Sequence, residues 1–159
     1  METKTIVKEK SAVHWGVKVA ILLVFVPVIL GVYSIVNNNL PQKVLTLGGH
    51  QLRVEIAASD RARTKGLSGR ESLTENQGML FIFPTYARQA FWMKQMNFPL
   101  DLIWLRDGQV IGFKQDLPPE GNQPAHMYQP DENVNWVLEM PAGFVAKNQI
   151  KIGDMATIK

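Results

Sequence analysis

The sequence predicts a mainly β domain of the α+β class: a compact, barrel-like antiparallel sheet of short strands with one or two short helices, preceded by a single transmembrane helix. Three observations support this prediction. Apolar residues after position 43 occur in short segments separated by Gly, Pro, Asp and Asn. A single segment of that part begins and ends with clear helix signals, and many short strands with one short helix are typical of a barrel-like sheet. One long uncharged apolar stretch lies near the N-terminus.

That apolar stretch predicts the transmembrane helix. Residues 19–36 are 18 consecutive residues without a charge, and a helix of this length covers about 27 Å of the ~30 Å hydrocarbon core of a bilayer. Trp15 and Tyr33 flank it as interfacial aromatics do. A cleaved signal peptide is the alternative, but its apolar region is shorter and ends at a small-x-small site, which this stretch lacks. We therefore predict a helix over residues 15–36.

The flanks of this helix predict its orientation. Lysines precede the span, whereas the residues directly after it are uncharged, and cytoplasmic flanks are the positive ones. The sequence thus predicts a cytoplasmic tail at 1–14, a linker at 37–43 and an extracytoplasmic domain at 44–159, held at the plasma membrane.

The charge and cysteine content exclude several classes of function. Residues 1–43 carry five Lys and two Glu, whereas residues 44–159 carry twelve basic and twelve acidic residues. A domain without excess positive charge does not fit nucleic-acid binding, which needs a basic patch. The absence of cysteine excludes disulfides, cysteine-ligated zinc and thiol nucleophiles.

The domain begins with a predicted hairpin and a short helix. Residues 44–47 and 50–56 are strand-like and are joined by Gly48-Gly49, a strong two-residue turn signal. Ser59 is a suitable N-cap for a helix that Gly66 ends.

The rest of the domain is predicted to be mostly strands. Asp107-Gly108 marks a second hairpin, and the prolines and glycine of residues 116–133 indicate a long surface loop. Residues 143–148 are expected to make one helical turn. The predicted strands are 78–83, 90–96, 102–105, 110–113, 136–140, 150–152 and 155–158.

Four segments of the domain resemble an uncharacterised family, DUF family 192, in order and spacing over roughly residues 47–158. They are Gly66-Leu67-Ser68-Gly69-Arg70; Gly78-Met79-Leu80-Phe81; Phe91-Trp92-Met93-Lys94 with Pro99-Leu100-Asp101; and Val137-Leu138-Glu139 with Pro141-Ala142-Gly143 and Gly153-Asp154. The resemblance implies a small β-rich domain, often exported or anchored, and implies no activity.

Five residues of these segments form the predicted site: Arg70, Trp92, Lys94, Asp101 and Glu139. If they gather at one mouth of the sheet, they make a polar and aromatic pocket for a sugar or an anionic ligand. In the structural alternative, Lys94 and Asp101 form an ion pair that fixes a turn, Glu139 accepts loop N–H groups, and Trp92 belongs to the core.

The function predicted from these residues is a non-catalytic ligand-binding or accessory module of the cell envelope, with no cofactor and no metal. The histidines have no metal-ligand spacing. One alternative is an envelope glycan hydrolase that uses Asp101 and Glu139, which requires the two carboxyl groups to lie within ~5–10 Å. Another is a scaffold whose 116–133 loop contacts an envelope protein.

Overall fold

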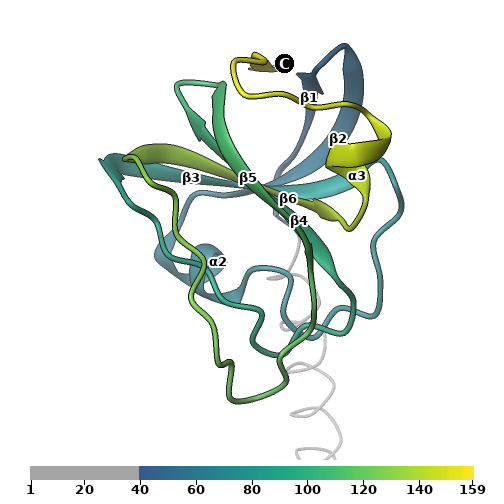
Figure 1. Cartoon of the computed structure of the whole chain (residues 1–159), viewed down its shortest axis with the longest axis vertical. Helices are drawn as coiled ribbons and strands as arrows, with labels where there is room; N and C mark the ends of the chain where they lie inside the picture. Colours follow the sequence, from purple (N-terminus) through teal and green to yellow (C-terminus); the bar gives the residue numbers. More distant parts are fainter. Residues whose placement is uncertain (1–39) are drawn as a thin grey trace, which may run out of the picture. The chain divides into compact units, whose positions relative to one another are not determined.

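A computed structural model of the chain describes residues 40–159 (Figure 1). The predicted tail, the predicted helix at 15–36 and the first residues of the predicted linker lie outside this part. Within residues 40–159, no helix is long and apolar enough to cross a membrane.

Residues 40–159 form a curled, half-barrel sheet of seven strands in the order β5-β4-β6-β3-β2-β1-β7. The prediction of a mainly β fold with few short helices is confirmed. The elements are β1 (Gln42–Leu47), β2 (His50–Ala57), α2 (Asp60–Lys65), β3 (Gln77–Ala87), β4 (Leu100–Arg106), β5 (Gln109–Leu117), β6 (Val134–Pro141), α3 (Phe144–Lys147) and β7 (Ala156–Ile158).

The local signals near the start of the domain act as expected. Gly48 and Gly49 both have positive φ, of 58° and 84°, which suits the tight turn between β1 and β2. The Ser59 hydroxyl caps α2 by accepting a hydrogen bond from the Ala62 N–H at 3.2 Å. β1 also takes in Gln42 and Lys43, the end of the predicted linker, because both pair with β2.

The prediction of a wholly antiparallel sheet is wrong for one pair of strands. β2 and β3 pair in parallel, with Glu55 opposite Met79. The connection between them contains α2 and the loop that follows it, and a long crossover of this kind is what a parallel pair requires.

The strand predicted at residues 90–96 is wrong. Backbone groups there bond to the Pro-rich loop instead of the sheet: Phe91 and Tyr128 exchange two hydrogen bonds, of 2.9 and 2.8 Å. The strand predicted at 150–152 is also missing, because the Ile150 N–H bonds to the carbonyl of Val145 in α3.

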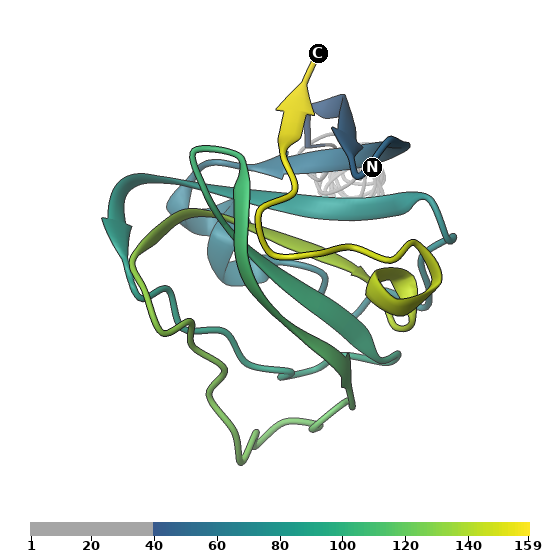
Figure 2. The same ribbon diagram turned by 45° about the horizontal axis from the view of Figure 1, so that its top comes forward.

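The C-terminal segment helps to curl the sheet. The N–H of Gly153 donates to the Val110 carbonyl at 2.8 Å, and the N–H of Ala156 donates to the Gly108 carbonyl at 2.7 Å. These bonds join the segment that leads into β7 to the start of β5, the strand at the other edge of the sheet order. Figure 2 shows this segment running from α3 past the β4–β5 hairpin.

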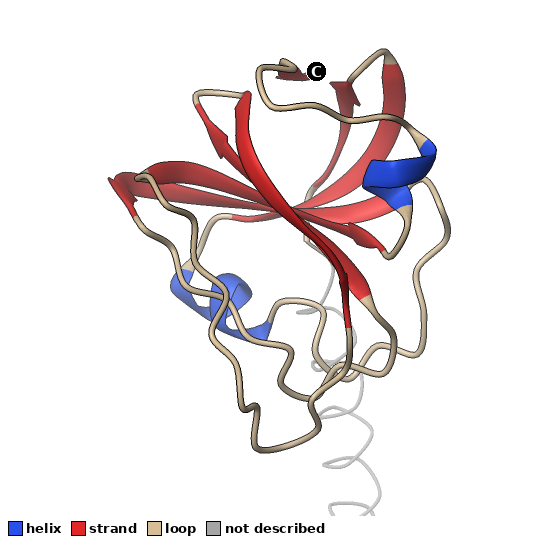
Figure 3. Cartoon of the chain, in the orientation of Figure 1, coloured by secondary structure: helices blue, strands red, loops and turns tan. Residues whose placement is uncertain are grey.

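Each face of the sheet has its own apolar core, and one helix lies on each face (Figure 3). The face with α3, here the α3 face, buries residues that include Leu80, Ile103, Leu138 and Phe144. The face with α2, here the α2 face, buries others that include Met79, Phe81, Leu102 and Val137.

Candidate functional site

The register of β4 and β6 places the two candidate carboxylates on opposite faces of the sheet. Asp101 lies opposite Met140, and Leu102 lies opposite Glu139. Neighbouring side chains on a strand point to opposite faces. Met140 belongs to the core of the α3 face and Leu102 to that of the α2 face. Asp101 and Glu139 therefore do not share a cleft.

Both oxygens of the Asp101 carboxylate accept hydrogen bonds from the backbone. It is completely buried, and its oxygens accept hydrogen bonds from three backbone N–H groups. The donors are Asp116 at 2.9 Å, Gly143 at 3.3 Å and Val145 at 2.8 Å. Asp101 thus joins β4 to the end of β5 and to the first turn of α3. The predicted ion pair with Lys94 is not formed, and within residues 40–159 Lys94 forms no ion pair.

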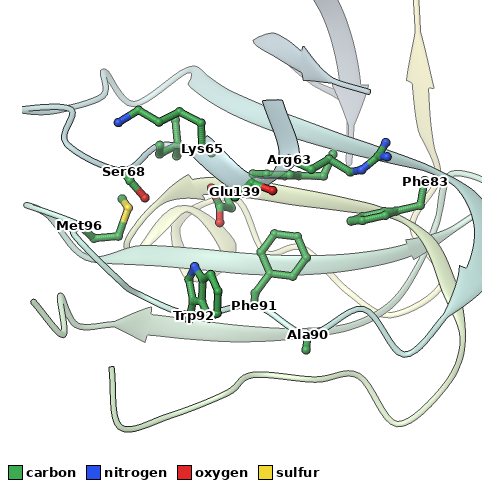
Figure 4. A pocket seen from close by; sticks show the side chains of 13 residues that line it. Arg63, Lys65, Ser68, Phe83, Ala90, Phe91, Trp92, Met96 and Glu139 are labelled. Carbon is green, nitrogen blue, oxygen red and sulfur yellow. The ribbon is translucent and has the colours of Figure 1, made fainter. Parts of the chain in front are cut away.

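Glu139 lies on the α2 face in a cavity of about 240 Å³. Figure 4 shows its side chain among Ser68, Phe91, Trp92 and Met96. The lining comes from four parts of the chain: α2 with the loop after it, β3, the irregular segment 88–99, and β6, which contributes Glu139. The lining residues are Arg63, Thr64, Lys65, Gly66, Leu67, Ser68, Phe81, Phe83, Ala90, Phe91, Trp92, Met96 and Glu139.

The carboxyl of Glu139 is buried and incompletely bonded. The residue is 6% exposed, and its Oε2 atom is buried without a hydrogen-bond partner among the described residues. Loss of solvation raises the pKa of this carboxyl to about 8, although the nearby Arg70 guanidinium lowers it in part. At neutral pH Glu139 is therefore mostly protonated and can donate a hydrogen bond. The structural alternative predicted that Glu139 accepts hydrogen bonds from loop N–H groups, but within residues 40–159 its side chain forms no such bond.

We expect this carboxyl to make stability depend on pH. The folded state keeps the proton up to pH about 8, whereas the unfolded chain loses it near 4.5. Stability from this group is thus complete below pH 4.5 and falls as the pH rises to 8. Between pH 6 and pH 8 the loss should be about 2 kcal/mol.

Urea unfolding of wild type and Glu139→Gln at both pH values measures this loss. The Gln variant cannot titrate at this position. Between pH 6 and pH 8 its free energy of unfolding should therefore fall by about 2 kcal/mol less than that of the wild type. Equal pH dependence in the two proteins would contradict the assignment.

Arg70 and Glu55 form a second charged group beside the cavity. The guanidinium contacts both carboxylate oxygens of Glu55, at 2.5 and 2.7 Å. Glu55, Met79 and Glu139 lie in one row across β2, β3 and β6. The bond with Glu55 raises the pKa of Arg70, so its charge is fixed. Arg70 is therefore hydrogen-bonded to Glu55, and it influences Glu139 only through the electrostatic effect of its positive charge.

Trp92 and Lys94 lie at the edge of the site. Trp92 is 46% exposed and lines the cavity. The structural alternative, which placed Trp92 in the core, is therefore wrong for this residue. The Lys94 ammonium stands 5.9 Å from the centre of the Trp92 ring. The Lys94 carbonyl accepts a hydrogen bond from the Ser68 hydroxyl at 3.1 Å. Of the five predicted residues, Arg70, Trp92, Lys94 and Glu139 are associated with the α2 face, and Asp101 is separated from them.

Several lining residues were not singled out from the sequence. Phe81 and Phe91 stand in the segments that carry the family resemblance and were taken only as core or strand residues. Glu55, the partner of Arg70, lies in the predicted strand 50–56 between Val54 and Ile56 and was not singled out either. Its face is covered by the loop after α2, which no pattern in the sequence placed there.

Comparison with known proteins identifies the family. The family model DUF192, described as "Uncharacterized ACR, COG1430", matches residues 43–158. The chain belongs to this family. The match includes every strand except the first residue of β1, so the DUF192 domain and the sheet coincide. No curated protein matches the chain.

Two solved structures resemble this DUF192 domain. One is a protein described as a "putative transcription regulator" from Sinorhizobium meliloti 1021, with 28% identity and a TM-score of 0.70 over 76% of this chain and 95% of that one. The other is a protein of unknown function from Novosphingobium aromaticivorans DSM 12444, with 28% identity and a TM-score of 0.70 over 76% of this chain and 88% of that one. The fold makes up nearly all of the first of these two chains, so in that protein it forms without a further large domain.

Proposed function

We propose that this DUF192 domain is a non-catalytic binding module for a small ligand, which it holds in the cavity of the α2 face. The observation that carries the proposal is Glu139, a buried carboxyl with an unpartnered oxygen in a cavity with aromatic walls. A buried polar group without a partner is costly. A ligand that bonds to it removes that cost, and apolar walls with a few placed polar groups are typical of small-molecule sites.

Glycan hydrolysis by Asp101 and Glu139 has no support in this geometry. Two carboxyl groups must flank one glycosidic bond, whereas these two lie on opposite faces of the sheet. The Asp101 oxygens already accept three backbone N–H groups. Binding of a ligand by the carboxyl of Glu139, in contrast, does not require a second carboxyl group.

A ligand screen by thermal shift on residues 40–159 tests the binding function. We expect a compound class that raises the melting temperature of the wild type, with the rise absent in Glu139→Leu, which keeps the bulk and removes the donor. Trp92→Ala should reduce the rise, because its half-exposed ring forms one wall. Lys43→Ala, at an exposed position of β1 that does not line the cavity, is the control and should change nothing. If every stabilising compound acts equally on wild type and Glu139→Leu, the cavity is not the site.

We also propose that residues 15–36 anchor the domain outside the plasma membrane, with residues 1–14 in the cytoplasm. The support is the uncharged stretch 19–36 and the lysines that precede it. The ligand is then a molecule or envelope component met outside the cytoplasm. The charge balance of residues 44–159 also favours a small ligand over nucleic acid.

Protease added to intact spheroplasts tests this topology. We expect an epitope at the C-terminus of the full chain to be removed while a cytoplasmic marker protein survives. A C-terminal epitope that is degraded only after lysis would refute the orientation.

A further inference from the structure

The charges around the cavity favour one class of ligand. Arg63 and Lys65 line the cavity, Arg70 acts on Glu139, and Lys94 stands over the ring of Trp92. Glu55 and Asp60 are the ion-pair partners of Arg70 and Arg63. Two of the four cations are paired with the two carboxylates. With Glu139 neutral, the surroundings keep an excess of two positive charges, which attracts an anion and opposes a cation.

The polar group inside the cavity indicates what the anion must offer. A neutral carboxyl is a hydrogen-bond donor, so Glu139 needs an acceptor. A bond from a carboxylic acid to an anionic oxygen is charge-assisted and stronger than one to a neutral oxygen. The Ser68 hydroxyl already donates to the Lys94 carbonyl, and the Arg63 guanidinium already donates to two backbone carbonyls and to Asp60. Both lining residues are thus already used by the protein, which disfavours a phosphate or a sugar with several oxygens to bind.

The walls indicate the rest of the ligand. Phe91, Trp92 and Met96 lie around the carboxyl (Figure 4), and Phe81 also lines the cavity. The Phe81 and Phe91 rings meet edge to face, with centroids 4.9 Å apart, so this wall is fixed. A flat apolar body packs well against such rings, whereas a polyol would leave hydroxyl groups unpaired there.

We propose that the cavity takes a small organic monocarboxylate, whose carboxylate accepts a hydrogen bond from Glu139 and whose apolar body packs on Phe91 and Trp92. This inference rests on the binding function proposed above and names its ligand class. It also couples binding to a proton. Because Glu139 must be protonated, affinity is highest below pH 8 and falls as the carboxyl ionises above it.

Three benzene derivatives of one size test the inference by titration calorimetry on residues 40–159: benzoate, benzamide and benzylammonium. At pH 7 we expect benzoate to bind more tightly than the other two compounds. At pH 9 benzoate should bind roughly tenfold more weakly than at pH 7, because the protonated fraction of Glu139 falls. Glu139→Gln keeps a neutral donor, so it should bind benzoate at both pH values with little change between them. Trp92→Ala should weaken binding without changing its pH dependence.

Different results overturn different proposals. Equal or tighter binding of benzamide or benzylammonium overturns the monocarboxylate class, and a pH dependence retained in Glu139→Gln overturns the coupling. If none of the three binds while another compound stabilises the wild type and not Glu139→Leu, the ligand class is wrong and the binding function stands. If no compound distinguishes wild type from Glu139→Leu, both proposals fail.

Discussion

Asp101→Ala is expected to lower the free energy of unfolding by about 4 kcal/mol, because it leaves buried backbone N–H groups without an acceptor. Three N–H groups lose their partner at once, on β5 and at the start of α3. Chemical denaturation monitored by tryptophan fluorescence measures the effect. Asp101→Asn keeps one acceptor oxygen but turns an amide N–H₂ toward a donor, so we expect an intermediate loss.

Asp154→Ala is the matched control for this change. Asp154 also accepts a backbone N–H, that of Lys151 at 2.8 Å, but the contact is exposed to solvent. Its loss should cost less than about 1 kcal/mol. If Asp101→Ala costs no more than Asp154→Ala, the carboxylate is not the link that the structure shows. A loss of ligand binding in stably folded Asp101→Asn would contradict the separation of the two faces.

Gly78→Ala is expected to lower the free energy of unfolding by about 3 kcal/mol, since inserting a methyl group into a filled core forces the backbone to shift. A Cβ atom at Gly78 would lie 2.5 Å from the Glu139 carbonyl oxygen and would also overlap the Met140 sulfur. The carbonyl belongs to the neighbouring strand β6 and cannot move without disturbing the sheet. Thermal unfolding and urea unfolding both measure the change.

Gly112→Ala is the control for the glycine substitution. Gly112 also lies in a strand, β5, but a Cβ atom there would meet the Trp104 ring at an ordinary distance of 3.6 Å. Alanine restricts the unfolded chain more than glycine, so this variant should be unchanged or slightly more stable. Similar losses for Gly78→Ala and Gly112→Ala would show that the close approach of β3 and β6 is not what requires glycine.

Local signals in the sequence predicted the turns and the helix ends well. The pairs Gly48-Gly49 and Asp107-Gly108 make the two tight turns, because few other residues adopt positive φ at low cost. Ser59 caps α2 for an equally local reason. Such features depend on residues a few positions apart, which a sequence displays directly.

Features that depend on distant residues were not predicted. The parallel pairing of β2 and β3 depends on where the long crossover returns the chain. Residues 90–96 have strand-like composition, yet their backbone partner is the loop around Tyr128. The faces of Asp101 and Glu139 follow from the β4–β6 register, since a shift of one residue in a strand reverses the face of a side chain.

The segment 88–99 gives the cavity a wall that is bonded mainly to other loops. Besides the Phe91–Tyr128 pair, the Gln95 N–H donates to the Gly121 carbonyl at 2.7 Å, and the Glu120 N–H donates to the Met93 carbonyl at 3.2 Å. The wall and the Pro-rich loop are thus one paired layer laid over the sheet. Opening this layer would break the bond from the Gly69 N–H to the Gln95 carbonyl, of 2.8 Å, and would expose Met93 and Met96 of the core, while the bonds between the strands would remain. On the binding function proposed above, a different layer on the same sheet would take a different ligand.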